Sequence, residues 1–157
     1  MDNLQFRKFE KKDFGSYFQL VSNEMVMAQI TERAIPLDEA KVNYQRIIDR
    51  NAEADMFGTY KIVENETFVG LGHLTSKTSG EAEIGYMILP EYWGKGYGTV
   101  IACHLIKLAT LTNTRIVKAI IDPRNSASRK ILLNQGFSSE KVCEMDGLPA
   151  EIFHKAL

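Results

Sequence analysis

The feature that most restricts the fold of this chain is the stretch Pro90-Glu91-Tyr92-Trp93-Gly94-Lys95-Gly96-Tyr97-Gly98-Thr99, which joins a strand pattern to a helix pattern. Pro90 ends the strand, and apolar residues from Ile101 onward then recur at helical spacing. Three glycines at alternate positions allow the backbone to close around an anion, toward which its amides can point. The helix that begins here adds the positive end of its dipole, and Lys95 can add a charge. The stretch therefore predicts a pyrophosphate site.

Other interpretations of the glycines are weaker. A nucleotide P-loop needs Ser or Thr after the lysine, but Lys95 is followed by Gly96. A dinucleotide fingerprint needs GxGxxG after the first strand of a parallel unit, whereas this stretch is GxGxG and follows hairpin strands. A tight turn that uses glycine only for its positive φ is the remaining structural alternative.

The rest of the chain divides into short strand and helix patterns, with Met25 to Ala34 left ambiguous. Strands are expected over Leu4–Lys8, Met56–Val63, Thr67–Thr75, Glu81–Leu89, Ile116–Ile121, Phe137–Met145 and Ala150–Leu157; helices over Phe14–Val21, from Pro36 to Asn51, from the glycine stretch to about Thr112, and over Ser126–Gln135. A turn is expected at Asp146-Gly147-Leu148-Pro149. The order β-α-α-β-β-β-α-β-α-β-β predicts an α/β (α+β mixed) fold, a mixed sheet with helices on both faces.

Composition limits the classes of function. The chain has 157 residues, 45% of them hydrophobic, and no linker or repeat, so a single domain spanning 1–157 is expected. The net charge of −1 argues against nucleic acid and anionic membranes as partners. No apolar run approaches the ~18 residues of a membrane span, and we expect a cytoplasmic protein. Two distant cysteines and three scattered histidines predict neither a disulfide framework nor a metal site.

Four motifs together resemble the GNAT superfamily of acyl-CoA transferases, in particular its RimJ/RimL-like branch. They are Glu83-Ile84-Gly85-Tyr86, then Pro90 with Trp93-Gly94-Lys95-Gly96-Tyr97-Gly98-Thr99, then Asn125-x-x-Ser128, and finally Gly136-Phe137. They cover about the second half of the domain in the right order and spacing. The resemblance implies the GNAT-like fold, with a mostly antiparallel sheet of about seven strands, and N-acetyl transfer from acetyl-CoA to a primary amine.

The resemblance also implies a set of cofactor-binding residues. The backbone of Met87, Ile88 and Leu89 would pair with the pantetheine arm as an added strand. The amides from Gly94 to Thr99, next to Trp93, would hold the pyrophosphate. Asn125 and Ser128 would flank the pantetheine arm, with helix capping as the structural alternative. Leu132 stands where some members carry a tyrosine as general acid, so the leaving thiolate would take its proton from water, Ser128 or another group.

The chemistry also needs a proton acceptor, because amines with a pKa of about 8 to 10.4 are largely protonated near pH 7 and only the neutral form attacks a thioester. Glu83 matches a family position often occupied by this base. Glu81, two residues away on the same face, competes with it, and a solvated or ion-paired strand carboxylate is the structural alternative. A strand amide near Met87 or Ile88 would stabilise the oxyanion.

The acceptor and the assembly remain open in the sequence. A protein N-terminus, a lysine, an aminoglycoside-like amine, a polyamine and an amino acid all fit, and a homodimer is one option. The first two helices and the last hairpin are expected to form the acceptor pocket, with lining candidates Tyr17, Met25, Met27, Tyr44 and Met145. The alternative functions are a catalytically inactive acyl-CoA-binding or sensor module and, more weakly, a nucleotide-binding regulatory domain.

Overall fold

The structure is a computed structural model that describes residues 3–157; Met1 and Asp2 of the expected domain lie outside the described residues. Its centre is a seven-stranded sheet in the order β1-β2-β3-β4-β5-β7-β6, in which every neighbouring pair is antiparallel except β4 and β5. The predicted mixed, mostly antiparallel sheet is confirmed. Within the described residues, no helix has the length and apolar character needed to cross a bilayer.

The strands largely follow the predicted ranges. They are β1 (Leu4–Lys8), β2 (Gly58–Glu64), β3 (Thr67–Ser76), β4 (Glu81–Ile88), β5 (Ile116–Ile121), β6 (Ser138–Met145) and β7 (Leu148–Ala156). Two hairpins turn on only two residues at positive φ, Asn65-Glu66 and Asp146-Gly147. The four-residue turn predicted at Asp146 to Pro149 is therefore too long, because Leu148 already pairs with Met145. Two-residue turns with positive φ match the twist of the strands they join.

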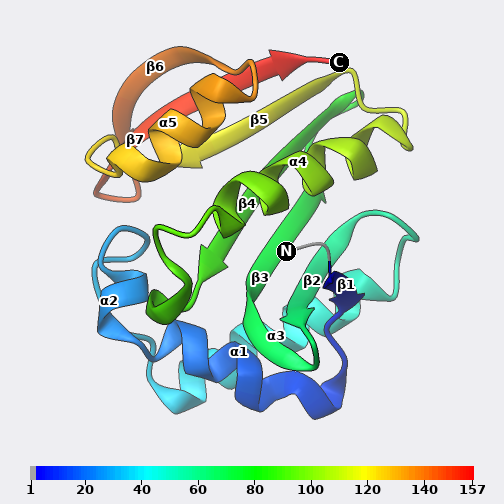
Figure 1. Ribbon diagram of the computed structural model, residues 1–157, viewed down its shortest axis with the longest axis vertical. Coiled ribbons are helices and arrows are strands. Elements are labelled where there is room, and N and C mark those ends of the chain that lie inside the picture. The colour runs from blue at the N-terminus through cyan, green and yellow to red at the C-terminus, as the bar shows by residue number, and fades with distance from the viewer. Residues whose placement is uncertain (1–2) are drawn as a thin grey trace.

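Helices cover both faces of the sheet, as predicted (Figure 1). They are α1 (Phe14–Val21), α2 (Glu24–Met27), α3 (Leu37–Asn51), α4 (Tyr97–Thr110) and α5 (Ser126–Asn134), with single 3-10 turns at Lys11–Asp13 and Pro90–Tyr92. On one face, Tyr17, Leu20, Ala40 and Tyr44 pack with Leu71 of β3 and with Leu89, which follows β4. On the other, Ile101 and Leu105 of α4 and Leu132 of α5 pack with Leu74, Ile84 and Phe153.

The ambiguous segment after Met25 contains only one short helix. The Asn23 side chain caps α2 by accepting hydrogen bonds from the amides of Met25 (2.9 Å) and Val26 (3.2 Å). The amides of Ile30, Thr31 and Glu32 then converge on the carbonyl of Met27, and Glu32 has a positive φ of 61°. The chain therefore leaves the helix after one turn and continues as a loop to Pro36.

Strands β4 and β5 separate along their length. The parallel ladder runs from Glu81 opposite Ile116 to Ile84 opposite Ala119, but β4 continues to Ile88 and β5 to Ile121. From Gly85 onward, β4 has no paired partner on this side among the described residues. The sheet is therefore open between the carboxyl ends of its two central parallel strands.

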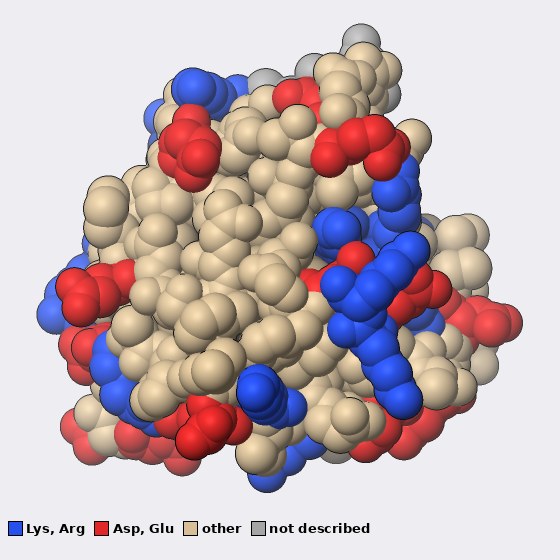
Figure 2. Space-filling model, turned by 90° about the horizontal axis from the view of Figure 1, so that it is seen from below, with Lys and Arg blue, Asp and Glu red and all other residues tan. Residues whose placement is uncertain are grey.

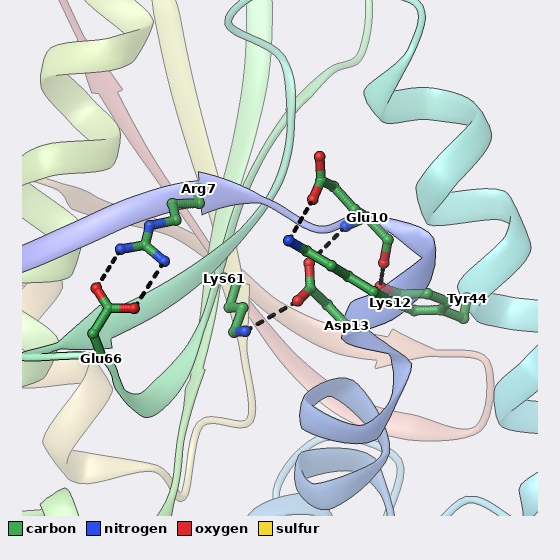
Figure 3. A network of polar contacts seen from close by, with 7 residues as sticks. All are labelled: Arg7, Glu10, Lys12, Asp13, Tyr44, Lys61 and Glu66. Atoms are coloured by element: carbon green, nitrogen blue, oxygen red, sulfur yellow. Dashed lines mark hydrogen bonds and ion pairs between the residues drawn. The ribbon is translucent and has the colours of Figure 1, made fainter.

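A polar network holds the start of α1 against β2 (Figure 3). The carboxylate of Asp13, which is almost buried, accepts hydrogen bonds from the Glu10 amide and from Lys61 Nζ, both at 3.0 Å. The Tyr44 hydroxyl donates to the Glu10 carbonyl from α3. Burial raises the pKa of Asp13, but the Glu10 amide and Lys61 outweigh it, so the pKa lies below its ordinary 3.8.

We expect Asp13→Asn to lower the free energy of unfolding at pH 7 by about 1–3 kcal/mol, the usual contribution of hydrogen bonds to a charged group. Because the folded-state pKa of Asp13 is depressed, its contribution is present above pH 3.8 and is lost as the pH falls through the folded value. Urea unfolding at pH 7 and near pH 2 measures this. A difference between the two proteins that is equally large at both pH values would contradict the assignment.

Candidate active site

A cavity of about 910 Å³ lies where β4 and β5 separate. Successive strand residues point to opposite faces, and the cavity touches both: His73, Glu83 and Met87 line it from one face, and Tyr86 and Ile88 from the other. Residues of α2, of the glycine-rich loop, of α5 and of the β6–β7 turn complete the lining. The opening between the strands therefore connects two approaches to one site.

The glycine-rich loop forms one end of the cavity. Gly94 and Gly96 have positive φ values of 70° and 90°, and Gly96 is the N-cap of α4. The amides of Tyr97, Gly98 and Thr99 belong to the first turn of this helix and have no acceptor within it. The geometry is that of an anion cradle with the helix dipole behind it.

Close packing holds this loop against the sheet and α5. The indole nitrogen of Trp93 donates to the carbonyl of Ile88 at 2.7 Å. A methyl group on Gly98 would lie 2.8 Å from Ile131 Cδ1 of α5, so only glycine fits there without movement. Lys130, on the same helix, is the one Lys or Arg side chain among the described cavity-lining residues.

The register of β4 shows which backbone groups face the opening. The Leu89 amide donates to the Val69 carbonyl at 3.0 Å, and Met87 pairs with Leu71, so both direct their backbone groups toward β3. The backbone groups of the intervening residues Tyr86 and Ile88 therefore point toward the side from which β5 has separated. The expectation that Met87 and Leu89 offer free edge groups is therefore wrong. Of the three predicted backbones only Ile88 faces the opening, and because its carbonyl already accepts the Trp93 indole, its amide is the group that it offers.

Helix α5 brings the Ser128 hydroxyl to the cavity, next to Tyr86 of β4. Asn125 caps the helix, with its side chain accepting the Ser128 amide at 3.1 Å, so the capping alternative is present. The hydroxyl of Tyr86 is buried and has no hydrogen-bond partner within residues 3–157. Burial raises the pKa of Tyr86, and the nearby Ser128 hydroxyl only partly offsets this. Leu132 is a core residue, 1% exposed.

The opposite face carries the titratable groups. Glu83 lines the cavity, whereas Glu81 does not. The Glu83 carboxylate lies 3.4 Å from Lys77 Nζ. His73 pairs with Gly85 across the strands, and its Nδ1 is 3.1 Å from the Thr75 hydroxyl. Burial lowers the pKa of His73, as do Lys77 and Arg50, while Glu83 raises it, and the net pKa is below 6.5.

Most of the residues predicted from the sequence meet at this cavity. Those that line it are Glu83, Met87, Ile88, Trp93, Gly94, Gly96, Tyr97, Gly98, Thr99, Asn125 and Ser128. Leu89 is buried in the core on the side of α1 and α3, and Lys95 is an exposed residue that does not line the cavity. Met25 and Met145 line it, but Tyr17, Met27 and Tyr44 are core residues beneath α1 to α3, contrary to the expected acceptor pocket. His73 and Tyr86 were not predicted as site residues.

Comparison with known families decides what this arrangement is. Residues 3–138 match the family model described as an acetyltransferase (GNAT) domain. The chain belongs to the GNAT acetyltransferase family. It is therefore an acyltransferase enzyme that uses acetyl-CoA for N-acetylation, as the motifs implied. The uncharacterised N-acetyltransferase p20 of Bacillus licheniformis is 27% identical over an alignment of 145 residues that covers 88% of this chain and 81% of that protein.

Solved structures agree with the GNAT domain in fold. A structure of RimL, a ribosomal L7/L12 alpha-N-protein acetyltransferase in complex with coenzyme A, has a TM-score of 0.84 at 16% identity and covers 100% of this chain and 96% of its own. Spermidine N-acetyltransferase from Vibrio cholerae, in complex with CoA and spermine, has a TM-score of 0.81 at 20% identity. The match covers 99% of this chain and 96% of that chain. At these identities the likeness establishes the shared fold.

Carboxylates outnumber cationic side chains in the described lining of the cavity of this GNAT domain. Its acidic lining residues are Glu32, Glu83, Asp122 and Asp146, against the single cation Lys130 on α5. Asp122 and Glu32 are both bridged by Arg124, at 2.7 and 3.0 Å. Seen from below the view of Figure 1, the middle of the surface carries few charged side chains, which gather to its right and around its edges (Figure 2). The exposed apolar residues Met25 and Ile30 line the cavity from the segment of α2 and its following loop.

Proposed function

We propose that this protein transfers the acetyl group of acetyl-CoA to a primary amine, either a small-molecule amine or a protein N-terminus, by direct attack of the amine on the thioester. One observation carries the proposal. The cavity passes through the opening between β4 and β5, with an anion cradle at one approach and titratable side chains at the other. A donor and an acceptor can thus enter from opposite faces and react where the strands part.

On the donor side, the amides of Gly94 to Thr99 would hold the CoA pyrophosphate at the start of α4. Ile88, and Tyr86 beside it, would offer backbone groups to the pantetheine arm, which would lie along β4 where β5 has ended. Asn125 and Ser128 would flank the arm from α5. A strand amide at this open edge would stabilise the oxyanion.

A primary amine arrives mostly as an ammonium ion, and Glu83 is the carboxylate that lines the cavity on the face of His73, although Lys77 partly compensates its charge. An ammonium group must then lose a proton before it attacks, and Glu83 belongs to the path by which that proton leaves. The apolar side chains of Met25, Ile30, Met145 and Leu148 would contact the body of the amine. Holding amine and thioester together would supply much of the rate enhancement.

Turnover of acetyl-CoA against a panel of primary amines tests the proposal. The panel contains polyamines, aminoglycosides, amino acids and short peptides with free N-termini, and free CoA thiol is measured together with the acetylated product by mass spectrometry. We expect amine-dependent CoA release with at least one cationic acceptor. Binding of acetyl-CoA without acetylation of any acceptor would instead indicate an inactive acyl-CoA-binding module, and preferential thermal stabilisation by ATP or NAD would indicate a nucleotide-binding domain.

A further inference from the structure

We propose that His73, and not Glu83, directly takes the proton from the attacking amine, and that Glu83 acts through His73. This inference rests on the proposed function and names the proton acceptor of that same site.

The position of His73 carries the argument. The β4–β5 ladder ends at Ile84 opposite Ala119, so Gly85 is the first residue of the open part of β4. His73 pairs with Gly85 across the neighbouring strand, and its ring lies over the glycine. A methyl group on Gly85 would overlap His73 Nε2 and would lie 2.9 Å from Cδ2. Gly85 therefore leaves the space that the ring occupies, and the ring sits where the two approaches to the cavity meet.

Glu83 lies two residues before Gly85 on β4, farther from the opening between β4 and β5. It pairs with Thr75 on one side and with Lys118 on the other, where β4 and β5 are still joined. Its carboxylate lies next to the ammonium of Lys77, at 3.4 Å. An amine that meets a thioester at the opening of the strands therefore reaches His73 before it reaches Glu83.

The hydrogen bonds of His73 suit a proton acceptor. Nδ1 is 3.1 Å from the Thr75 hydroxyl. With its proton on Nδ1 and donated to that hydroxyl, the neutral ring presents the Nε2 lone pair above Gly85. The groups that influence its titration come from β4, the β3–β4 turn and α3: Glu83 raises its pKa, whereas burial, Lys77 and Arg50 lower it. Because the net effect lowers the pKa of His73 below 6.5, the ring is neutral at pH 7. The Glu83 carboxylate then stabilises the imidazolium once it forms.

Atoms and protons balance across the transfer step. The amine attacks in its neutral form, after the ammonium has lost one proton, which ends in solvent. Its nitrogen forms a bond to the acetyl carbon while the carbonyl π pair moves to oxygen, and the second proton, on the now cationic nitrogen, moves to Nε2 of His73. The carbon–sulfur bond then breaks, and sulfur leaves as a thiolate. The proton that His73 releases to solvent is matched by the one that the thiolate takes up, so the products are the amide and free CoA thiol, with no oxidant or reductant needed.

The test compares His73→Asn with Glu83→Gln in the full chain, using pH profiles of kcat and acetyl-CoA affinity from calorimetry. Two acceptors whose amines differ in pKa are used, because an acidic limb that belongs to His73 does not move when the amine changes. For His73→Asn we expect kcat to fall by about 10²- to 10⁴-fold, the usual contribution of a positioned base, with the acidic limb lost. Asparagine can still hydrogen-bond Thr75, and acetyl-CoA affinity should stay within about threefold.

For Glu83→Gln we expect a smaller loss of kcat and an acidic limb displaced to lower pH, because the group that raises the pKa of His73 is gone. If His73→Asn folds poorly, rescue of His73→Ala by added imidazole replaces it, since the vacated space above Gly85 admits the free ring. An unchanged profile in His73→Asn would overturn the inference, as would loss of the acidic limb in Glu83→Gln alone. Absence of turnover in the wild-type protein would instead count against the proposed function.

Discussion

Replacing Gly96 with valine is expected to reduce the affinity for acetyl-CoA by about a hundredfold or more, because two hydrogen bonds to a charged pyrophosphate contribute about 3 kcal/mol and each 1.4 kcal/mol is a factor of ten. Gly96 is the N-cap of α4 and has a φ of 90°, a region that a β-branched residue avoids. Valine would force the backbone to rotate and turn the first amides of α4 away from the anion. Calorimetry with CoA measures the loss, and circular dichroism reports whether the helix content is retained.

Gly136→Val is the matched control for backbone strain. Gly136 has a φ of 89°, ends α5, and lies outside the cavity. An added Cβ there would meet only the end of the flexible Lys155 side chain. We expect both variants to lose similar amounts of stability, but only Gly96→Val to lose CoA binding. If both lost CoA affinity to the same extent, the effect would be one of general destabilisation and the cradle assignment would fail.

The sequence predicted the fold well wherever local patterns decide it. Alternating and helical periodicities located the strands and the long helices, and Pro90 followed by alternate glycines located the junction before α4. The segment after Met25 could not be assigned, because a single helical turn capped by Asn23 has too few residues to show a period. The predicted β6–β7 turn is too long because proline is typical of turns, whereas Pro149 stands opposite Glu144 in the hairpin.

The site was predicted less completely, because parts of it depend on the register between strands. Without that register, Met87 and Leu89 could not be told from Ile88 as edge residues. His73 is one of three scattered histidines in the sequence, and its place at the site follows only from the strand register that sets Gly85 opposite it. Similarly, Tyr86 was visible as part of a motif, but the burial of its hydroxyl beside Ser128 is a property of the packed α4 and α5.

Replacing Gly85 with alanine is the second change from which we expect a large effect. The new methyl group would overlap Nε2 of the His73 ring, which lies over the glycine. The ring would have to rotate away from Thr75 and from the opening between β4 and β5. If the ring position matters for proton transfer, kcat should fall by about tenfold to a hundredfold, within the usual range for a displaced base, while the affinity for acetyl-CoA changes little.

Gly15→Ala is the control, because Gly15 lies in α1 and a methyl group there has no atom within 4 Å. It should raise stability by about 0.5–1 kcal/mol, as alanine does in a helix, and leave turnover unchanged. The informative comparison is between Gly85→Ala and the double variant with His73→Asn. If the glycine acts through the histidine, the two changes together should cost little more than His73→Asn alone. Fully additive losses would show that Gly85 and His73 act independently, and the space above Gly85 would then matter for another reason.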